Sequence, residues 1–108
     1  MIEIDDNYDS VIKDEFEKGN IVVLQFTSEF CEPCFALEIE LEELEEKRDD
    51  VTVLSIDCNE NENITELYDV YQTPTMVIFN KQKEIIYNDI GVILCNDILQ
   101  IIDANINS

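Results

Sequence analysis

The chain has 108 residues, 45% of them apolar, which is enough for one folded domain with one core. Its 26 acidic residues outnumber 6 basic ones, and the formal charge of −20 repels nucleic acid phosphates and anionic membrane surfaces. The longest apolar runs are far shorter than the ~20 residues that a membrane helix needs. We therefore expect a single domain over residues 1–108 that binds neither nucleic acid nor membrane.

The amino-terminal residues Met1–Asp6 contain neither the basic stretch nor the apolar region of a secretory signal peptide. On this pattern we expect a cytoplasmic protein. Because the cytoplasm keeps thiols reduced, closely spaced cysteines there are more often catalytic or metal-binding than structural.

The hydrophobic pattern of the first part of the chain alternates between strand and helix. Met1–Ile4 can form a short strand, and apolar residues then recur at helical spacing over Tyr8–Lys18, where only Glu15 is out of character. Gly19 is suited to end this helix. The β-branched run Ile21–Phe26 predicts a buried strand in the middle of the sheet.

The clearest helix of the chain runs from Cys34 to about Lys47, with leucines at helical spacing and glutamates on the remaining faces. A second buried strand, Val51–Ile56, follows, and then a shorter helix that extends to Tyr71. Aromatic residues on apolar faces usually pack inside a protein. We expect this of Tyr68, Tyr71 and Phe79.

The last part of the chain predicts a hairpin and a helix. Thr75–Phe79 and Glu84–Tyr87 form its two strands, joined by a short polar connection. The final helix begins near Asn96 or Asp97, which are good capping residues. The resulting order of elements is βαβαβαββα, which indicates an α/β fold.

A pair of cysteines, in Cys31-Glu32-Pro33-Cys34, lies between the central strand and the clearest helix. Unpaired backbone amides and the helix dipole favour a thiolate at a helix start, and Pro33 suits a first turn because it has no N–H to leave unpaired. A zinc half-site and a structural disulfide are the alternatives. The chain has no histidine, and Cys58 and Cys95 stand alone. A redox-active dithiol without a metal is therefore favoured, and the two lone cysteines are interpreted as ordinary residues.

The chain resembles the thioredoxin family over nearly its full length. The resemblance rests on the element order, on Cys31-x-Pro33-Cys34 at the start of the long helix, on Thr73-Pro74-Thr75 at the start of the hairpin, and on Gly91 before the last helix. It implies a thioredoxin fold with a central mixed sheet of four to five strands flanked by about four helices. It also implies a cis Thr73–Pro74 bond, an isomer that costs X-Pro only ~0.5–1 kcal/mol.

The resemblance further implies the reduction of protein disulfides. Cys31 would be the attacking nucleophile, Cys34 would resolve the mixed disulfide, and the backbone at Thr73 would pair with an extended substrate segment. The redox-active disulfide takes the place of a cofactor. The implied partners are disulfide-containing proteins and an electron donor of the thioredoxin reductase type, and we expect a monomer. The implied substrate-binding residues are Phe30, in place of the usual tryptophan, Thr73, Pro74 and Gly91.

Three further positions depart from the family pattern. Glu32 replaces the usual glycine and Phe35 replaces a common lysine, and both changes should raise the pKa of the Cys31 thiol. Gln25 stands where the family has a buried acidic residue, so its neutrality acts in the opposite direction. It also removes a proton acceptor for the second cysteine. We expect a reductant with a somewhat basic Cys31 thiol and slow resolution of the mixed disulfide.

The sequence is compatible with three functions. The first is a general dithiol–disulfide oxidoreductase, which the intact cysteine pair with Pro33 and Pro74 favours. The second is a dedicated redox partner of one client, for which Glu32, Phe35 and the charge of −20 would set specificity. The third is a non-catalytic thioredoxin-like binding module.

Overall fold

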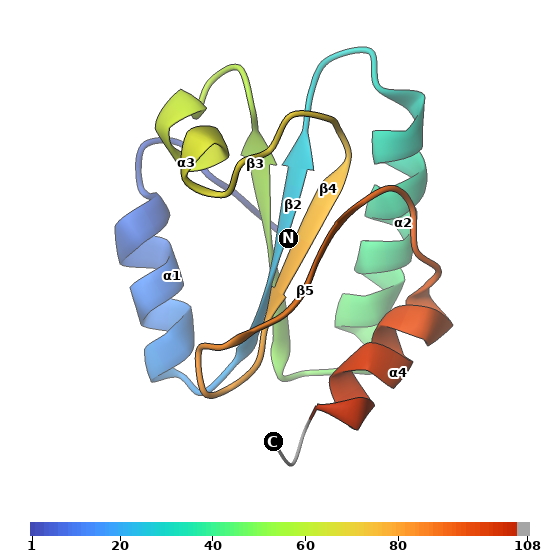
Figure 1. The fold of residues 1–108 in the computed structure, drawn as a ribbon. Helices are drawn as coiled ribbons and strands as arrows, with labels where there is room; N and C mark the ends of the chain where they lie inside the picture. Colours follow the sequence, from blue (N-terminus) through green and yellow to red (C-terminus); the bar gives the residue numbers. More distant parts are fainter. Residues whose placement is uncertain (106–108) are drawn as a thin grey trace.

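A computed structural model describes residues 1–105 of the chain. The elements follow the predicted order (Figure 1). Their bounds are β1 Ile2–Glu3, α1 Tyr8–Glu17, β2 Ile21–Thr27, α2 Glu32–Lys47, β3 Val51–Asp57, α3 Glu62–Leu67, β4 Thr75–Phe79, β5 Ile85–Ile90 and α4 Cys95–Ala104.

The five strands form one mixed sheet in the order β1-β3-β2-β4-β5. Strand β2 is central, because it pairs in parallel with β3 and antiparallel with β4. Thr27 lies opposite Asp57, so β2 and β3 end at the same edge of the sheet, the upper edge in Figure 1. The loops that follow these two strands therefore lie side by side.

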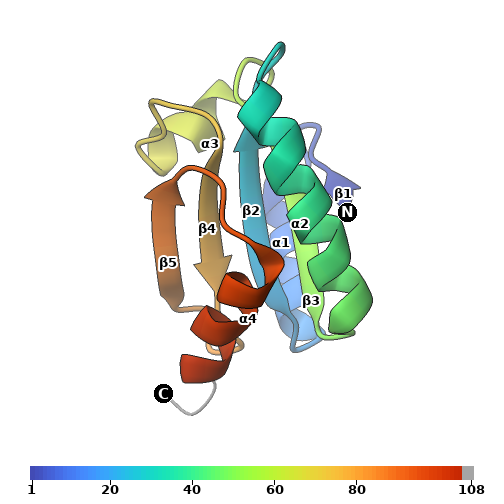
Figure 2. The same ribbon diagram turned by 90° about the vertical axis from the view of Figure 1, so that its right-hand side faces the viewer.

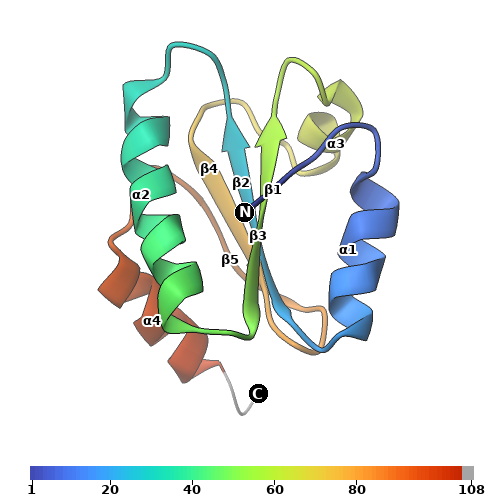
Figure 3. The ribbon, with the colours of Figure 1, turned by 180° about the vertical axis from the view of Figure 1, so that it is seen from behind.

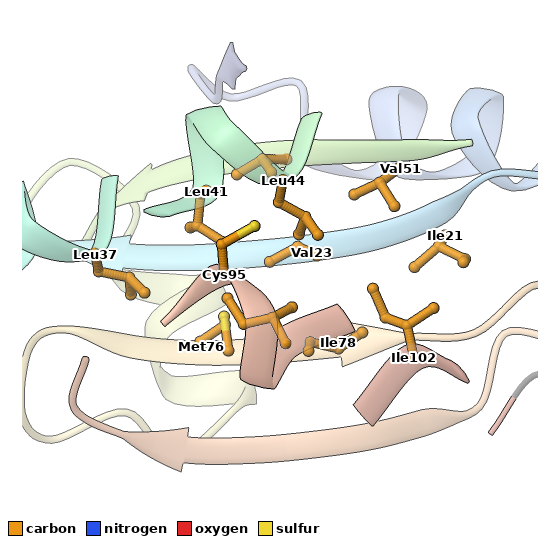
Figure 4. Close-up of a cluster of buried hydrophobic side chains, with 12 residues drawn as sticks. Ile21, Val23, Leu37, Leu41, Leu44, Val51, Met76, Ile78, Cys95 and Ile102 are labelled. Atoms are coloured by element: carbon orange, nitrogen blue, oxygen red, sulfur yellow. The ribbon is translucent and has the colours of Figure 1, made fainter. Parts of the chain in front are cut away.

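Helices cover both faces of the sheet. Figures 2 and 3 show α2 and α4 on one face, whereas α1 and α3 lie on the other. Successive side chains of a strand point to opposite faces, so Val23 joins the core under α2 and α4 while Leu24 joins the core under α1. The predicted leucine repeat of α2 is fully buried in the first of these cores (Figure 4). The leucine repeat consists of Leu37, Leu41 and Leu44.

The structure corrects the expected end of the third helix. Helix α3 ends at Leu67, and Asp69 then adopts a left-handed backbone conformation with φ of 53°. Tyr71 therefore lies beyond the helix, and its side chain is 84% exposed rather than packed. Tyr68 and Phe79 do pack, with their ring centroids 6.3 Å apart.

Glu15, the charged residue among the apolar positions of α1, is buried, and polar side chains pair with its carboxylate. Its carboxylate accepts hydrogen bonds from the Thr52 hydroxyl at 2.6 Å and the Asn20 amide at 2.9 Å, and it pairs with Lys18 at 3.1 Å. Burial alone would raise the pKa of Glu15, but these hydrogen bonds outweigh burial and lower that pKa.

The helix stops at Gly19, whose φ of 80° is favourable only for glycine.

Within residues 1–105, no helix combines the length and the apolar character needed to cross a membrane.

Candidate dithiol site

The paired cysteines lie at the edge of the sheet where β2 and β3 end, at the top of Figure 1. Phe30 has a left-handed backbone conformation with φ of 56°, which turns the chain from β2 into α2. Cys31 is the N-cap of α2, and it is joined by a disulfide to Cys34, with 5.3 Å between their Cα atoms. We call this edge of the sheet the dithiol edge and the opposite edge, where β2 and β3 begin, the far edge.

The two sulfur-bearing residues differ in exposure. Cys34 is 3% exposed, whereas Cys31 is only partly covered. The backbone N–H of Cys34 donates a hydrogen bond to Cys31 Sγ at 3.2 Å, so it points the positive end of the helix at the outer sulfur. Pro33 is the second residue of α2, as its missing N–H favours. This arrangement stabilises a thiolate on Cys31 once the disulfide is open.

Thr73, which is far from the cysteines in sequence, lies against the outer sulfur. Its hydroxyl donates to Cys31 Sγ at 3.6 Å, and its Oγ1 lies 2.7 Å from Ser28 Oγ. Ser28 and Thr73 are therefore hydrogen-bonded to each other beside the outer sulfur. Sequence reasoning missed Ser28, since a serine in a turn carries no signal of a partner 45 residues away.

The segment around Pro74 is held between the cysteines and β5. The Thr73–Pro74 bond is cis, as expected from the resemblance. The N–H of Gly91, a residue with φ of 110°, donates to the Pro74 carbonyl at 2.9 Å, and the Thr75 hydroxyl donates to the Gln72 carbonyl at 2.6 Å. The structure thus brings Thr73 against Cys31 and joins Gly91 to Pro74. The resemblance to the family had implied that these residues share one site.

Gln25 lies beneath the dithiol on β2 and is 2% exposed. Its side-chain amide donates to the Cys34 carbonyl at 3.2 Å. Its Oε1 atom is buried and has no hydrogen-bond partner among the described residues. The site therefore has a neutral amide oxygen next to the inner cysteine, at the position where the family has a buried acidic residue. We expected this replacement to remove the proton acceptor for Cys34.

The other unusual residues lie on the surface. Phe30 is 97% exposed and Phe35 is 63% exposed. Glu32 is exposed directly beside Cys31, and no ion pair is recorded for it within residues 1–105. Phe30 and Glu32 flank Cys31 in the chain, and Phe35 follows Cys34. Their effect on the chemistry of the dithiol stays a prediction.

The two remaining cysteines lie on opposite faces of the sheet. Cys58 directly follows β3 at the dithiol edge, where it lines a hollow together with Thr73. Cys95 is 2% exposed in the core under α2 and α4, whereas Cys58 packs against the core on the other face of the sheet. Burial raises the pKa of both thiols. Within residues 1–105, no group of three or more histidine, cysteine or acidic residues is arranged to hold a metal ion.

A disulfide on the first turn of a helix, beside a cis X-Pro bond that opens a strand, defines a protein of the dithiol–disulfide exchange class. The family model described as Thioredoxin matches residues 1–104. The chain belongs to the thioredoxin family, a family of thiol–disulfide oxidoreductases.

Individual relatives agree with this assignment. The chain is similar to thioredoxin H5 of Oryza sativa subsp. japonica, with 33% identity over 73% of this chain and 58% of that protein. It is also similar to a thioredoxin of Chlamydia pneumoniae, with 33% identity over 67% of this chain and 71% of that protein. Among solved structures, spinach chloroplast thioredoxin f in its short form has a TM-score of 0.81 and 27% identity, over 99% of this chain and 93% of that chain. The matched stretch thus spans little more than half the length of the rice protein.

Proposed function

We propose that the chain reduces protein disulfides, with Cys31 as the nucleophile and Cys34 as the resolving cysteine. The proposal rests on the geometry of the disulfide. The two cysteines are bonded on the first turn of α2, with Cys31 reachable from solvent and Cys34 buried. A client disulfide can meet only the outer sulfur without a rearrangement of the helix.

The reaction starts from the dithiol. The Cys31 thiolate attacks one client sulfur, the client S–S bond breaks, and the other client sulfur leaves as a thiolate that takes up a proton. Cys34 then loses its proton and attacks Cys31 Sγ, which releases the second client thiol and forms the Cys31–Cys34 disulfide. Two electrons pass from the dithiol to the client. The N–H of Cys34 and the hydroxyl of Thr73 both point at Cys31 Sγ and stabilise its negative charge.

The partners and the setting belong to the same proposal. An extended client segment pairs with the backbone at Thr73, and a separate electron donor of the thioredoxin reductase type restores the dithiol. The disulfide itself is the only redox group that the reaction requires. We further propose that the chain acts as a single domain and a monomer in the cytoplasm.

A disulfide-reduction assay tests the proposal. Purified chain is supplied with dithiothreitol and insulin, and the rate of insulin precipitation is followed for the wild type and for Cys31→Ser. We expect Cys31→Ser to lose essentially all activity above the dithiothreitol background, and Cys58→Ser to keep it as a matched cysteine control. Activity that survives Cys31→Ser would favour the non-catalytic binding module instead.

A further inference from the structure

The basic residues of the chain are sorted to one end of the molecule. Ile21 lies opposite Val51, and Val22 lies opposite Phe79, so the turns before β2, after α2 and after β4 all lie at the far edge. These turns and the helix ends beside them carry five of the 6 basic residues, and Lys13 lies midway along α1. Ion pairs hold several of them, such as Arg48 and Lys81 with Asp50 at 2.9 and 3.0 Å. The five are Lys18, Lys47, Arg48, Lys81 and Lys83.

The dithiol edge has the opposite character. Glu29, Glu32, Asp69 and Asp89 are exposed there, and no ion pair is recorded for them within residues 1–105. The seven residues of β2 separate this edge from the five basic residues of the far edge by roughly 20 Å, more than the Debye length at physiological salt. The five basic residues of the far edge therefore do not cancel the negative potential at the dithiol.

A hollow of about 120 Å³ lies beside the segment that we expect clients to pair with. Tyr71 and Thr75, the residues two before and two after Thr73, both line it. Asp69 and Asp89 also line it, together with Tyr68, Asn88 and Ile90, so two acidic residues and two tyrosines border a space close to the substrate-pairing backbone. Tyr71, at 84% exposure, offers a ring face that is not used in packing.

We propose that the dithiol edge docks a cationic client segment, with a lysine or arginine side chain of the client entering the hollow between Asp69, Tyr71 and Asp89. The inference rests on the proposed function and names its substrate class. In an extended segment, residues two apart point to the same side and lie ~7 Å from each other. A client cysteine over Cys31 therefore places the residue two positions away near the hollow.

Charge and ring chemistry both favour this occupant. A cation near two carboxylates gains Coulomb energy that a neutral or acidic side chain does not, and a tyrosine ring attracts a lysine or arginine through cation–π contact. Acidic client segments meet like charge here, because no lysine or arginine within residues 1–105 lies at this edge. The apolar side chains of Phe30 and Phe35 are exposed beside the disulfide and are available for contact with the client.

Three model peptides test the inference. Each has the same length and one disulfide to a small neutral thiol, with lysine, serine or glutamate two positions from the cysteine on both sides. The second-order rate of reduction by the dithiol form of the wild type is measured at low and high salt. We expect the lysine peptide to react at least ~10-fold faster than the glutamate peptide at low salt, with the serine peptide between them, and we expect the ratio to fall at high salt.

Two variants of equal net charge locate the effect. Asp69→Asn/Asp89→Asn removes two negative charges from the hollow and should reduce the lysine-to-glutamate ratio of reduction rates to about a third or less. Asparagine keeps a side-chain oxygen and tolerates the positive φ of Asp69, so the local backbone should be retained. Glu46→Gln/Asp49→Asn removes the same charge near the far edge and should leave most of the ratio. Equal loss in both variants, or no preference in the wild type, overturns the inference. Hydroxyethyl disulfide, a small neutral substrate, is the separate check, because only failure of the proposed function abolishes its reduction.

Discussion

At the scale of single residues, Gln25 distinguishes this dithiol site. It is buried beneath Cys34, donates to the Cys34 carbonyl at 3.2 Å, and leaves its own Oε1 unpartnered among the described residues. A buried acceptor without a partner costs about 1–3 kcal/mol of stability. A neutral amide at this depth positions the first turn of α2 but cannot take the proton that Cys34 must lose before it attacks.

The substitution Gln25→Glu should therefore speed resolution of the mixed disulfide. Burial raises the pKa of a carboxyl group at this depth, so its ionised form can accept the Cys34 proton near neutral pH. We expect a gain of about 10²-fold in the release of the second client half, and the gain should grow as the pH rises and the carboxyl ionises. Stopped-flow measurement of a preformed mixed disulfide gives this rate.

Gln25→Met is the matched control for this prediction. Methionine keeps a similar length and removes both polar atoms, so it perturbs the packing without providing a base. An equal acceleration in both variants would mean that the amide slows resolution by holding α2 in place rather than by failing to accept a proton.

At the scale of elements, the buried Glu15 joins three parts of the chain. Its carboxylate takes hydrogen bonds from the end of α1, from the turn before β2 and from Thr52 of β3. Removing the charge leaves Thr52 and Asn20 with a weaker acceptor in a buried place. These hydrogen bonds therefore hold α1 against the sheet, and none of them involves a residue of the dithiol site.

We predict that Glu15→Gln lowers the free energy of unfolding by about 1–2 kcal/mol at pH 7. The pKa of Glu15 is lowered below its usual value of 4.5 in the folded state, so the stabilisation is complete above pH 4.5 and is lost as the pH falls through the folded pKa. Urea unfolding of both proteins from pH 7 to pH 3 should show the difference narrowing below pH 4.5. Glu17→Gln, an exposed change on the same helix, should show no such pH dependence, and a constant difference for Glu15→Gln would contradict the account.

The elements could be predicted from the sequence wherever a local pattern fixes them. The leucine repeat of α2 and the β-branched runs of β2 and β3 gave the correct order of elements because periodicity depends on nearby residues. The end of α3 was predicted wrongly, because it depends on the left-handed backbone of Asp69, which no residue pattern marked. Glu15 looked misplaced because its partner Thr52 is 37 residues away.

The site could be predicted only in part, for the same reason. The chemistry of Cys31 and Cys34 follows from their spacing at a helix start. Their proximity to Thr73 came from resemblance to a family and not from any local pattern. The contact between Ser28 and Thr73, and the hollow beside Tyr71, depend on chain segments that meet only in the folded structure.

At the scale of the whole molecule, the charge of −20 opposes folding. Like charges are brought closer together in the compact state than in the unfolded chain, and the ion pairs at the far edge offset only part of this repulsion. The dithiol edge keeps unpaired acids in spite of that cost. The charge distribution therefore lowers the stability of the fold while it gives the reactive end a strong negative potential.

We predict that salt stabilises the protein. Raising sodium chloride from ~20 mM to ~500 mM shortens the Debye length from roughly 20 Å to roughly 4 Å, so repulsion between distant acids is screened. The urea midpoint should rise while the m-value stays constant. Glu42→Gln/Glu46→Gln, which removes two exposed acids from α2, should gain less from the same salt. A midpoint that falls with salt would show that the far-edge ion pairs outweigh the repulsion.

The most direct test of the account is the capture of its intermediate. The reduced Cys34→Ser variant is mixed with a peptide disulfide, quenched in acid, and digested for mass spectrometry without reduction. We expect one peptide half per chain, attached at Cys31, and no adduct in a Cys31→Ser/Cys34→Ser variant. An adduct on Cys58 or Cys95, or none at all under conditions in which the wild type reduces the same peptide, would contradict Cys31 as the nucleophile.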